Sequence, residues 1–306
     1  MPTQIGVLTT YYSKNYGAVL QAYAISKKLE MMGYDQELIR YKKEPPSYYT
    51  PSAILEAEKN KTISEIVLQK INNAFIKFKK LYQSDEGNAV RNKMFDEFVS
   101  DFLRLSPERY SSEEAFIKAV PNMPYDVFLC GSDQIWNPIV HNFDQVYYLN
   151  FKTRAKKVAY APSVAFNQFT DREIRRICDS IQSIDYISVR EKSTIVWLQP
   201  NLEKKVHLVI DPTFLLDKQE WLTLPTEKHP HGNYILVYLL NYNEQNSNIV
   251  ELISRYAIEK QYNILCLPYT NIKFPKKIPT EYRYDIAPND FIHLLNGAKC
   301  IITNSF

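Results

Sequence analysis

The stretch Tyr125-Asp-Val-Phe-Leu-Cys-Gly-Ser-Asp-Gln-Ile-Trp-Asn137 decides the fold. Its apolar run, 127–130, is short and nearly continuous, which is typical of a strand buried on both faces of a parallel sheet. Gly131 ends the strand, because glycine turns the backbone without a steric penalty from Cβ. Polar side chains follow at once: Ser132, Asp133, Gln134 and Asn137. Open α/β sheets bind ligands beyond the carboxyl ends of their strands, so these residues are candidates for a site. In the alternative interpretation, Ser132 and Asp133 only cap the next turn.

Three further predicted strands end in the same way. Strands are expected at 158–161, 186–189 and 206–210, and the polar residues at or just beyond their ends are Ser163, Arg190 and Asp211. Four successive strands that each end in polar residues predict one sheet edge assembled as a binding site.

The N-terminal segment predicts the start of a doubly wound sheet. A strand at 5–8 is followed by a polar loop, a helix at 16–32 that ends at Gly33, and a second strand at 37–40. The helix begins near Asn15, Tyr16 and Gly17, where free N–H groups can hold a phosphate or carboxylate. The chain has no G-x-G-x-x-G motif, so dinucleotide binding is not predicted.

With 306 residues the chain is long enough for two domains. We expect an N-terminal Rossmann-like domain over 1–228 and a partial C-terminal one over 229–306. A helical insertion is expected at about 45–123, with helices near 63–82, 93–102 and 113–119. Simple packing is the first interpretation of this insertion, and a lid or an acceptor-binding surface is the alternative. In the C-terminal part, strands are expected at 234–240, 264–267 and 300–302, and helices at 248–259 and 289–296.

Composition narrows the class of protein. The net charge of +3 and the absence of a strongly basic block argue against nucleic-acid binding. The four cysteines lack metal-ligand spacing, and three lie in apolar runs, which is typical of reduced core thiols. His229 and His231 lack further ligands, so no metal site is predicted. No apolar run reaches ~18 residues and the N-terminus is not a signal peptide, so we expect a cytoplasmic, soluble protein.

Several motifs, taken together and in order, resemble the polysaccharide pyruvyltransferases. They are Asn15-Tyr-Gly-Ala-Val-Leu-Gln-Ala22, Gly131-Ser-Asp-Gln-Ile-Trp136, Ser188-Val-Arg-Glu191, Asp211-Pro-Thr-Phe214, and Pro288-Asn-Asp-Phe291 running into Ile301-Ile-Thr-Asn-Ser-Phe306. The resemblance implies an α/β fold with two Rossmann-like domains in a GT-B-like arrangement. It also implies transfer of a pyruvyl group from phosphoenolpyruvate to sugar hydroxyls of a cell-surface polysaccharide or its lipid-linked precursor.

Two positions depart from the family pattern. Related enzymes often carry Gly-Asp where this chain has Gly17-Ala18. The family's Ser-Phe pair is normally followed by a histidine, and here the sequence ends at Phe306. The C-terminal domain is therefore expected to be truncated, and His293 is not expected to substitute for the missing histidine.

The expected chemistry requires groups that neutralise two anions and move protons. Arg190 is predicted to clamp an anion, because its planar guanidinium pairs bidentately with carboxylate or phosphate; a salt bridge with a nearby acid is the alternative. Backbone N–H groups at 15–17 and 304–305 are predicted to complete the anion site. Asp133 is the predicted base on the acceptor hydroxyl, whereas Asp211 is expected mainly to form a turn. The expected substrate-binding residues are Asn15, Tyr16, Gly17, Ser132, Gln134, Ser163, Arg190, Asp211, Asn304 and Ser305.

The expected partners are phosphoenolpyruvate as donor substrate and a sugar or lipid-linked oligosaccharide as acceptor, which would bring the protein close to a membrane. No cofactor is expected. Two other hypotheses stay open. One is a GT-B glycosyltransferase that uses a nucleotide sugar, and the other is a non-catalytic, truncated binding fragment. Stabilisation by phosphoenolpyruvate, by a UDP- or GDP-sugar, or by neither distinguishes them.

Overall fold

The computed structural model describes residues 2–43, 85–165, 169–228, 232–240, 248–270 and 272–305. The predicted helix near 63–82 and the histidine pair at 229 and 231 lie outside these ranges. Contacts divide the chain into two compact units. The first unit takes residues 1–11, 21–75 and 103–216, and the second takes 12–20, 76–102 and 217–306. Within the described residues, no helix is long and apolar enough to cross a membrane.

The first unit contains a parallel sheet with seven described strands in the order β3-β2-β1-β4-β5-β6-β7. The strands are β1 (Gln4–Leu8), β2 (Asp35–Tyr41), β3 (Leu105–Tyr110), β4 (Val127–Cys130), β5 (Lys156–Ala159), β6 (Tyr186–Val189) and β7 (Val206–Leu208). The sheet grows in one direction from β1 to β3 and in the other from β4 to β7. The strand order therefore reverses between β1 and β4, which is where doubly wound sheets bind their ligands.

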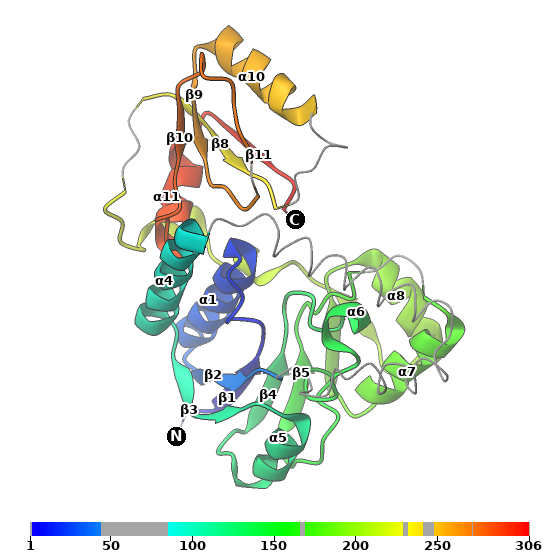
Figure 1. Cartoon of the computed structure of the whole chain (residues 1–306). Helices are drawn as coiled ribbons and strands as arrows, with labels where there is room; N and C mark the ends of the chain where they lie inside the picture. The colour runs from blue at the N-terminus through cyan, green and yellow to red at the C-terminus, as the bar shows by residue number, and fades with distance from the viewer. Residues whose placement is uncertain are drawn as a thin grey trace, which may run out of the picture. The chain divides into compact units, whose positions relative to one another are not determined.

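The helices connect these strands (Figure 1). They are α1 (Tyr16–Met31), α5 (Glu113–Ala119), α6 (Pro138–His141), α7 (Asp171–Ile181) and α8 (Lys192–Leu198), with short 3-10 turns at Val120–Asn122, Gln199–Asn201 and Pro212–Phe214. Ser112 caps α5 through a hydrogen bond from the Ala115 N–H, as predicted. Gly33 follows α1 with a φ of 85°, the left-handed conformation expected at the end of a helix.

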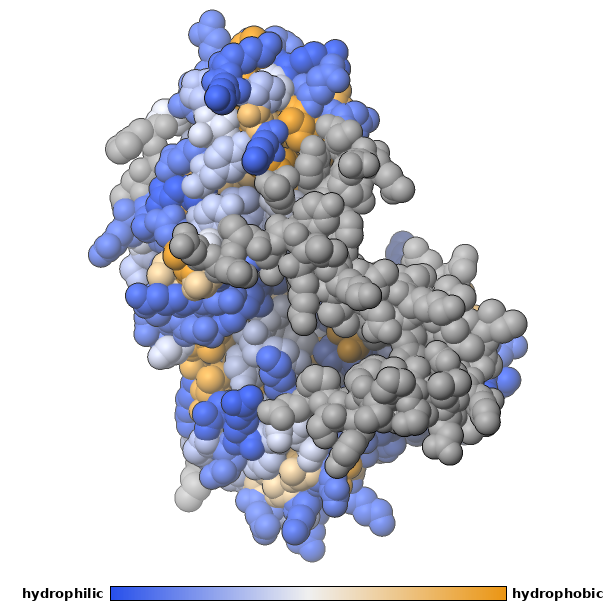
Figure 2. All heavy atoms as spheres, in the orientation of Figure 1, coloured by the Kyte–Doolittle hydropathy of each residue, from blue (hydrophilic) through white to orange (hydrophobic). Residues whose placement is uncertain are grey.

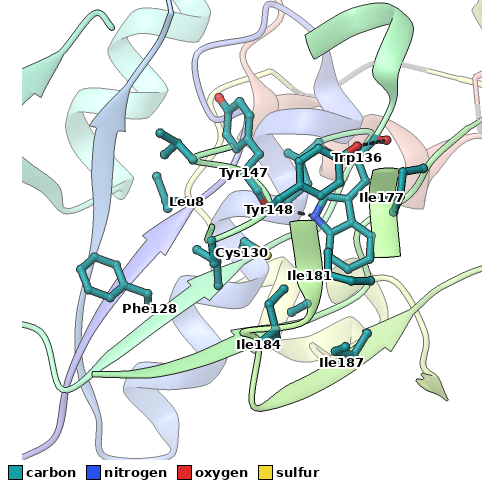
Figure 3. Packing of buried hydrophobic residues seen from close by; sticks show 14 of the residues in the cluster. Leu8, Phe128, Cys130, Trp136, Tyr147, Tyr148, Ile177, Ile181, Ile184 and Ile187 are labelled. Carbon is teal, nitrogen blue, oxygen red and sulfur yellow. Dashed lines mark hydrogen bonds between the residues drawn. The ribbon is translucent and has the colours of Figure 1, made fainter. Parts of the chain in front are cut away.

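The core of the first unit is built on one face of β4. Phe128 and Cys130 point to this face and belong to the same buried cluster as Trp136, which is fully buried (Figure 3). The indole Nε1 of Trp136 donates to the Tyr147 carbonyl over 3.0 Å, and the Tyr148 hydroxyl donates to the Trp136 carbonyl over 3.0 Å. Trp136 is thus a core residue that fixes the segment after the Gly-Ser-Asp turn.

The second unit contains a parallel sheet with four described strands in the order β10-β9-β8-β11. The strands are β8 (Tyr234–Tyr238), β9 (Asn263–Cys266), β10 (Thr280–Tyr282) and β11 (Cys300–Thr303), and the helices are α4 (Asp85–Phe102), α9 (Lys218–Leu222), α10 (Asn248–Lys260) and α11 (Pro288–Gly297). Alternate residues of β8 face α10 and α11. Ile235 and Val237 share a core with Ile253 of α10, whereas the Tyr238 ring contacts Phe291 of α11. The two helices therefore cover opposite faces of the sheet (Figure 1).

The α/β class with two parallel sheets is confirmed, whereas the GT-B-like arrangement of the two domains stays a prediction. Three local differences stand out. Strand β3 lies inside the segment expected to be a helical insertion, and β10 was not predicted. Helix α4 was expected on the first domain but clusters with the second unit, where Phe95 contacts the Tyr16 ring at 4.9 Å. The predicted domain boundary at 228/229 stays a prediction.

All four cysteines are free, and Cys130, Cys178 and Cys266 are buried, as expected of core thiols. Among the residues that Figure 2 colours by hydropathy, hydrophilic side chains predominate on the face shown, and a small hydrophobic area lies near α10. A groove of about 430 Å³ beside this helix is lined by Val250, Glu251, Ser254, Arg255, Ile258, Pro275 and Lys277. None of these residues belongs to the predicted site.

Candidate functional site

The carboxyl edge of the first sheet brings together three predicted site residues. Arg190 follows β6, and its Nη1 donates to Asp211 Oδ2 over 2.8 Å. Ser132, which follows β4, places its hydroxyl oxygen 3.0 Å from the same Asp211 oxygen and 2.8 Å from the Ala161 carbonyl. Residues that are distant in sequence thus form one connected polar network beyond three strand ends.

Arg190 is held on two sides by carboxylates. Besides Asp211, its Nε donates to Glu191 Oε1 over 2.9 Å, and its side chain is only 13% exposed. Burial disfavours the charged guanidinium, but the hydrogen bond to Glu191 and the negative charges of Asp211 and Glu191 outweigh it, so the pKa of Arg190 is raised. The salt bridge considered as the alternative for Arg190 is present. It orients the guanidinium at the sheet edge and does not by itself exclude a ligand.

Asp211 is mainly a structural acceptor. Its Oδ1 receives the Thr213 N–H over 3.0 Å and the Thr213 hydroxyl over 2.8 Å, which caps the turn Pro212–Phe214. Because Oδ2 contacts Arg190 and Ser132, both carboxylate oxygens are engaged. The structure thus gives Asp211 the turn-forming role expected from its position before a proline, together with an unpredicted role as partner of Arg190.

Asp133 lies at the reversal point of the sheet. The Thr10 hydroxyl, just beyond β1, donates to Asp133 Oδ2. The Asp133 carbonyl accepts the Ser163 N–H over 2.8 Å, so Asp133 joins the ends of β1 and β5. Its side chain is half-buried, and its backbone has a φ of 62°. This position suits a carboxylate that accepts a proton from a ligand at the sheet edge.

Sequence reasoning missed four polar neighbours of this network. Thr10 binds Asp133, and Gln21 accepts the Ser132 N–H over 3.0 Å while donating to Thr9 over 2.7 Å. Tyr160 has a raised pKa because of burial and, secondarily, the charge of Asp211. His141, at the end of α6, has a pKa lowered to about 4 by burial, against the opposing influence of Asp133. Only the Gln21 position was visible beforehand, as part of the 15–22 motif.

The remaining predicted residues of the first unit form local hydrogen bonds that stabilise turns. Gln134 accepts from the Asn137 amide over 3.0 Å, and Ser163 is buried, with its hydroxyl accepting the Ala165 N–H over 3.0 Å. Both stabilise turns at the sheet edge. Their predicted contacts with substrate stay predictions.

The other predicted residues belong to the second unit. Tyr16 is buried, its ring stacks on Phe291 at 4.1 Å, and its hydroxyl donates to the Ile286 carbonyl over 2.8 Å. The Tyr16 side chain thus packs within the second unit, and its predicted contact with substrate stays a prediction. The Gly17 N–H donates to Asn15 Oδ1 over 2.9 Å, so Asn15 caps α1 and occupies an N–H group that was predicted to bind an anion.

Polar groups at the end of β11 also form hydrogen bonds within the chain. Asn304 Oδ1 accepts the Leu240 N–H over 2.8 Å, and the Ser305 N–H donates to the Thr303 hydroxyl over 2.9 Å. The Ser305 N–H predicted to complete the anion site thus already has an acceptor. Among the described residues, no cluster of three or more His, Cys, Asp or Glu side chains is arranged to hold a metal ion.

Comparisons with known proteins place this geometry in a family. The chain is similar to two solved structures at low sequence identity. One is MnaA from S. aureus in complex with UDP, with 11% identity over 100% of this chain and 75% of that chain, and a TM-score of 0.48. The other is UDP-GlcNAc 2-epimerase from Methanocaldococcus jannaschii, with 13% identity over 100% of this chain and 79% of that chain, and a TM-score of 0.45.

The curated protein sequences contain no significant match to this chain. The family model of the polysaccharide pyruvyl transferases, in contrast, matches residues 15–306. This range includes every residue of the Ser132, Arg190 and Asp211 network. The chain therefore belongs to the polysaccharide pyruvyl transferase family, which is a family of transferases.

Proposed function

We propose that the protein transfers a pyruvyl group from phosphoenolpyruvate to two hydroxyls of a sugar, in a polysaccharide or in its lipid-linked precursor. The observation that carries the proposal is the guanidinium of Arg190, which Asp211 and Glu191 orient at the carboxyl edge of the parallel sheet. A guanidinium in this position suits a donor that carries a carboxylate and a phosphate.

The reaction balances without an external oxidant or reductant. One sugar oxygen bonds to the central carbon of phosphoenolpyruvate while the methylene gains a proton and becomes a methyl group. The C–O bond to phosphate then breaks, and the second sugar oxygen bonds to the same carbon to close the ketal. The two hydroxyl protons are accounted for by the new methyl group and by the released hydrogen phosphate.

Each residue of the network has a role in this proposal. Arg190 pairs with the carboxylate or phosphate of the donor. Asp133, held by the Thr10 hydroxyl, accepts a proton from an acceptor hydroxyl, a kind of general base catalysis that contributes about 10²- to 10⁴-fold. Ser132 and Asp211 hold Arg190 and the Gly-Ser-Asp turn in place.

A binding experiment tests the proposal. Phosphoenolpyruvate is titrated into the wild-type chain and the Arg190→Lys variant by calorimetry, and a UDP-sugar is titrated in parallel. We expect phosphoenolpyruvate to bind the wild type, and Arg190→Lys to weaken it at least about tenfold, because lysine lacks the planar fork. Arg104→Lys is the matched control, because Arg104 pairs with Asp35 at the amino end of β2, at the opposite edge of the same sheet. Binding of the UDP-sugar without phosphoenolpyruvate would overturn the proposal in favour of a glycosyltransferase.

A further inference from the structure

A buried arginine in the second unit has no acidic partner among the described residues. Arg91 of α4 is 6% exposed, and its guanidinium donates to the Pro268 carbonyl and, over 3.2 Å, to Asn88 Oδ1. It lies over the ring of Tyr269 at 4.5 Å and near the ring of Tyr284 at 5.6 Å. Two neutral acceptors and two aromatic rings do not neutralise the positive charge, and a guanidinium has five N–H donors. The site therefore favours an anion.

A buried hydroxyl nearby is also unsatisfied. Tyr238, the last residue of β8, is 3% exposed, and its hydroxyl makes no hydrogen bond with any described residue. Its ring lies 5.8 Å from that of Tyr269, so it belongs to the same cluster as Arg91. Burial raises its pKa well above the ordinary value, which keeps the hydroxyl protonated and able to donate.

The first turn of α1 adds to this arrangement. The Tyr16 ring lies 5.2 Å from that of Tyr238, and the Tyr16 N–H acts on the Tyr238 hydroxyl to lower its pKa, against the larger effect of burial. This N–H belongs to the first residue of a helix of 16 residues, whose N-terminus carries a partial positive charge. Two carboxylates act electrostatically on Tyr16. Asp285 forms ion pairs with Arg283 and Lys228, and Asp290 accepts hydrogen bonds from the Thr226 hydroxyl and the Ala287 N–H.

We propose that Arg91, the Tyr238 hydroxyl and the Tyr16 N–H at the start of α1 form a second anion site, which binds a phosphoryl group at the carboxyl edge of the four-stranded sheet. The placement agrees with the topology, because Tyr238 ends β8, Tyr269 follows β9 and Tyr284 follows β10. The chemistry suits either the phosphate of a small donor or the diphosphate of a carrier-linked acceptor. The proposal goes beyond the proposed function, because all its residues lie in the second unit.

The test measures phosphate binding in the Arg190→Lys background, in which the first-unit site is expected to bind at least about tenfold more weakly. Inorganic phosphate, pyrophosphate and phosphoenolpyruvate are titrated by calorimetry into this variant alone and with Arg91→Lys or Tyr238→Phe added. We expect Arg91→Lys to weaken phosphate binding at least about tenfold and Tyr238→Phe about threefold. Arg176→Lys is the matched control, because Arg176 also lies over an aromatic ring, that of Phe143 at 4.0 Å in the first unit, and we expect it to leave binding unchanged.

Each result of these titrations leads to a different conclusion about the second site. Tightest binding of phosphoenolpyruvate supports a site for the donor phosphate, and tightest binding of pyrophosphate supports a site for a diphosphate. If Arg91→Lys unfolds the chain, which circular dichroism detects, Tyr238→Phe decides, since it removes one hydroxyl and keeps the ring. Absence of phosphate binding in the Arg190→Lys background, or binding that neither substitution weakens, would overturn the second site while leaving the Arg190 proposal intact.

Discussion

The guanidinium of Arg190 and the carboxylate of Asp211 are joined by a hydrogen bond of 2.8 Å, although the residues follow two different strands, β6 and β7. Side-chain exposure is 13% for Arg190 and 17% for Asp211, so water screens this pair only weakly. The pair connects the ends of neighbouring strands and fixes the direction in which Arg190 presents its remaining N–H groups.

The first prediction concerns the charge of Asp211. Asp211→Asn keeps an oxygen that can cap the turn at Pro212 but removes one of the two carboxylates that pair with Arg190. We expect a loss of about 2 to 4 kcal/mol in the free energy of unfolding, because removing one partner leaves a largely buried charge incompletely paired. Urea unfolding measures this loss, and phosphoenolpyruvate titration should show weaker binding as Arg190 loses its orientation. Asp35→Asn, which breaks the exposed pair with Arg104, is the control and should cost less than about 1 kcal/mol. Equal losses in the two variants would contradict the prediction.

Sequence reasoning succeeded where burial repeats along a strand or helix. The strands Val127–Cys130 and Tyr186–Val189 and the helix Glu113–Ala119 were predicted with the observed bounds, because each has a distinct apolar pattern between polar residues. The two missed strands, β3 and β10, lie at the edges of their sheets. Strand β3 reads Leu-Ser-Pro-Glu-Arg-Tyr, and such a polar strand with an internal proline is tolerated only at an edge.

Only some residues of the candidate site could be predicted from the sequence. Polar residues at strand ends could be found from the sequence, because parallel strands bring their carboxyl ends to one edge. Their partners could not, since no spacing shows that Thr10 donates to Asp133 or that Ser132 and Arg190 share one oxygen of Asp211. Trp136, which follows these polar residues in the same stretch, has its indole fully buried in the core.

The second prediction concerns the turn after β4. Gly131 has a φ of 121°, and a Cβ built there would lie 1.9 Å from the Tyr160 carbonyl oxygen. Gly131→Ala should therefore lower the free energy of unfolding by at least about 3 kcal/mol, because it combines backbone strain with a clash against main chain. Gly33→Ala is the matched control, since Gly33 also has a positive φ, 85°, but no atom within 4 Å of the added Cβ. We expect the control to cost about 1 to 2 kcal/mol in guanidinium unfolding. A Gly131→Ala variant no less stable than Gly33→Ala would show that the turn relaxes easily.

The third prediction concerns the indole of Trp136. Trp136→Phe removes the donor to the Tyr147 carbonyl and leaves space in a fully buried position. The expected loss is about 2 to 4 kcal/mol, from the smaller ring and the unsatisfied carbonyl. Tyr148→Phe deletes only a hydroxyl that donates to the Trp136 carbonyl, and should cost about 1 kcal/mol. Thermal unfolding of both variants measures the difference, and a Trp136→Phe variant as stable as Tyr148→Phe would contradict the packing role assigned to the indole.

The fourth prediction concerns acid stability and His141. Burial lowers the pKa of His141 to about 4, despite the opposing charge of Asp133, whereas an unfolded histidine titrates near 6.5. Between these values the unfolded chain binds more protons than the folded chain, so His141 makes the protein less stable as the pH falls from about 6.5 to about 4. The effect should be about 3 kcal/mol at pH 4.

His141→Gln tests this by urea unfolding at several pH values from 4 to 7.5. The neighbouring groups Asp133 and Tyr147 are unchanged in the variant, so the difference between the two stability curves isolates the imidazole. We expect the variant to lose less stability on acidification than the wild type, with the two curves running parallel above about pH 7. His207→Gln is the control, because this histidine lies exposed on β7 and should leave the shape of the curve unchanged. Parallel curves for wild type and His141→Gln over the whole pH range would contradict the prediction. They would show that the His141 imidazole takes up its proton at the same pH in the folded and unfolded chains.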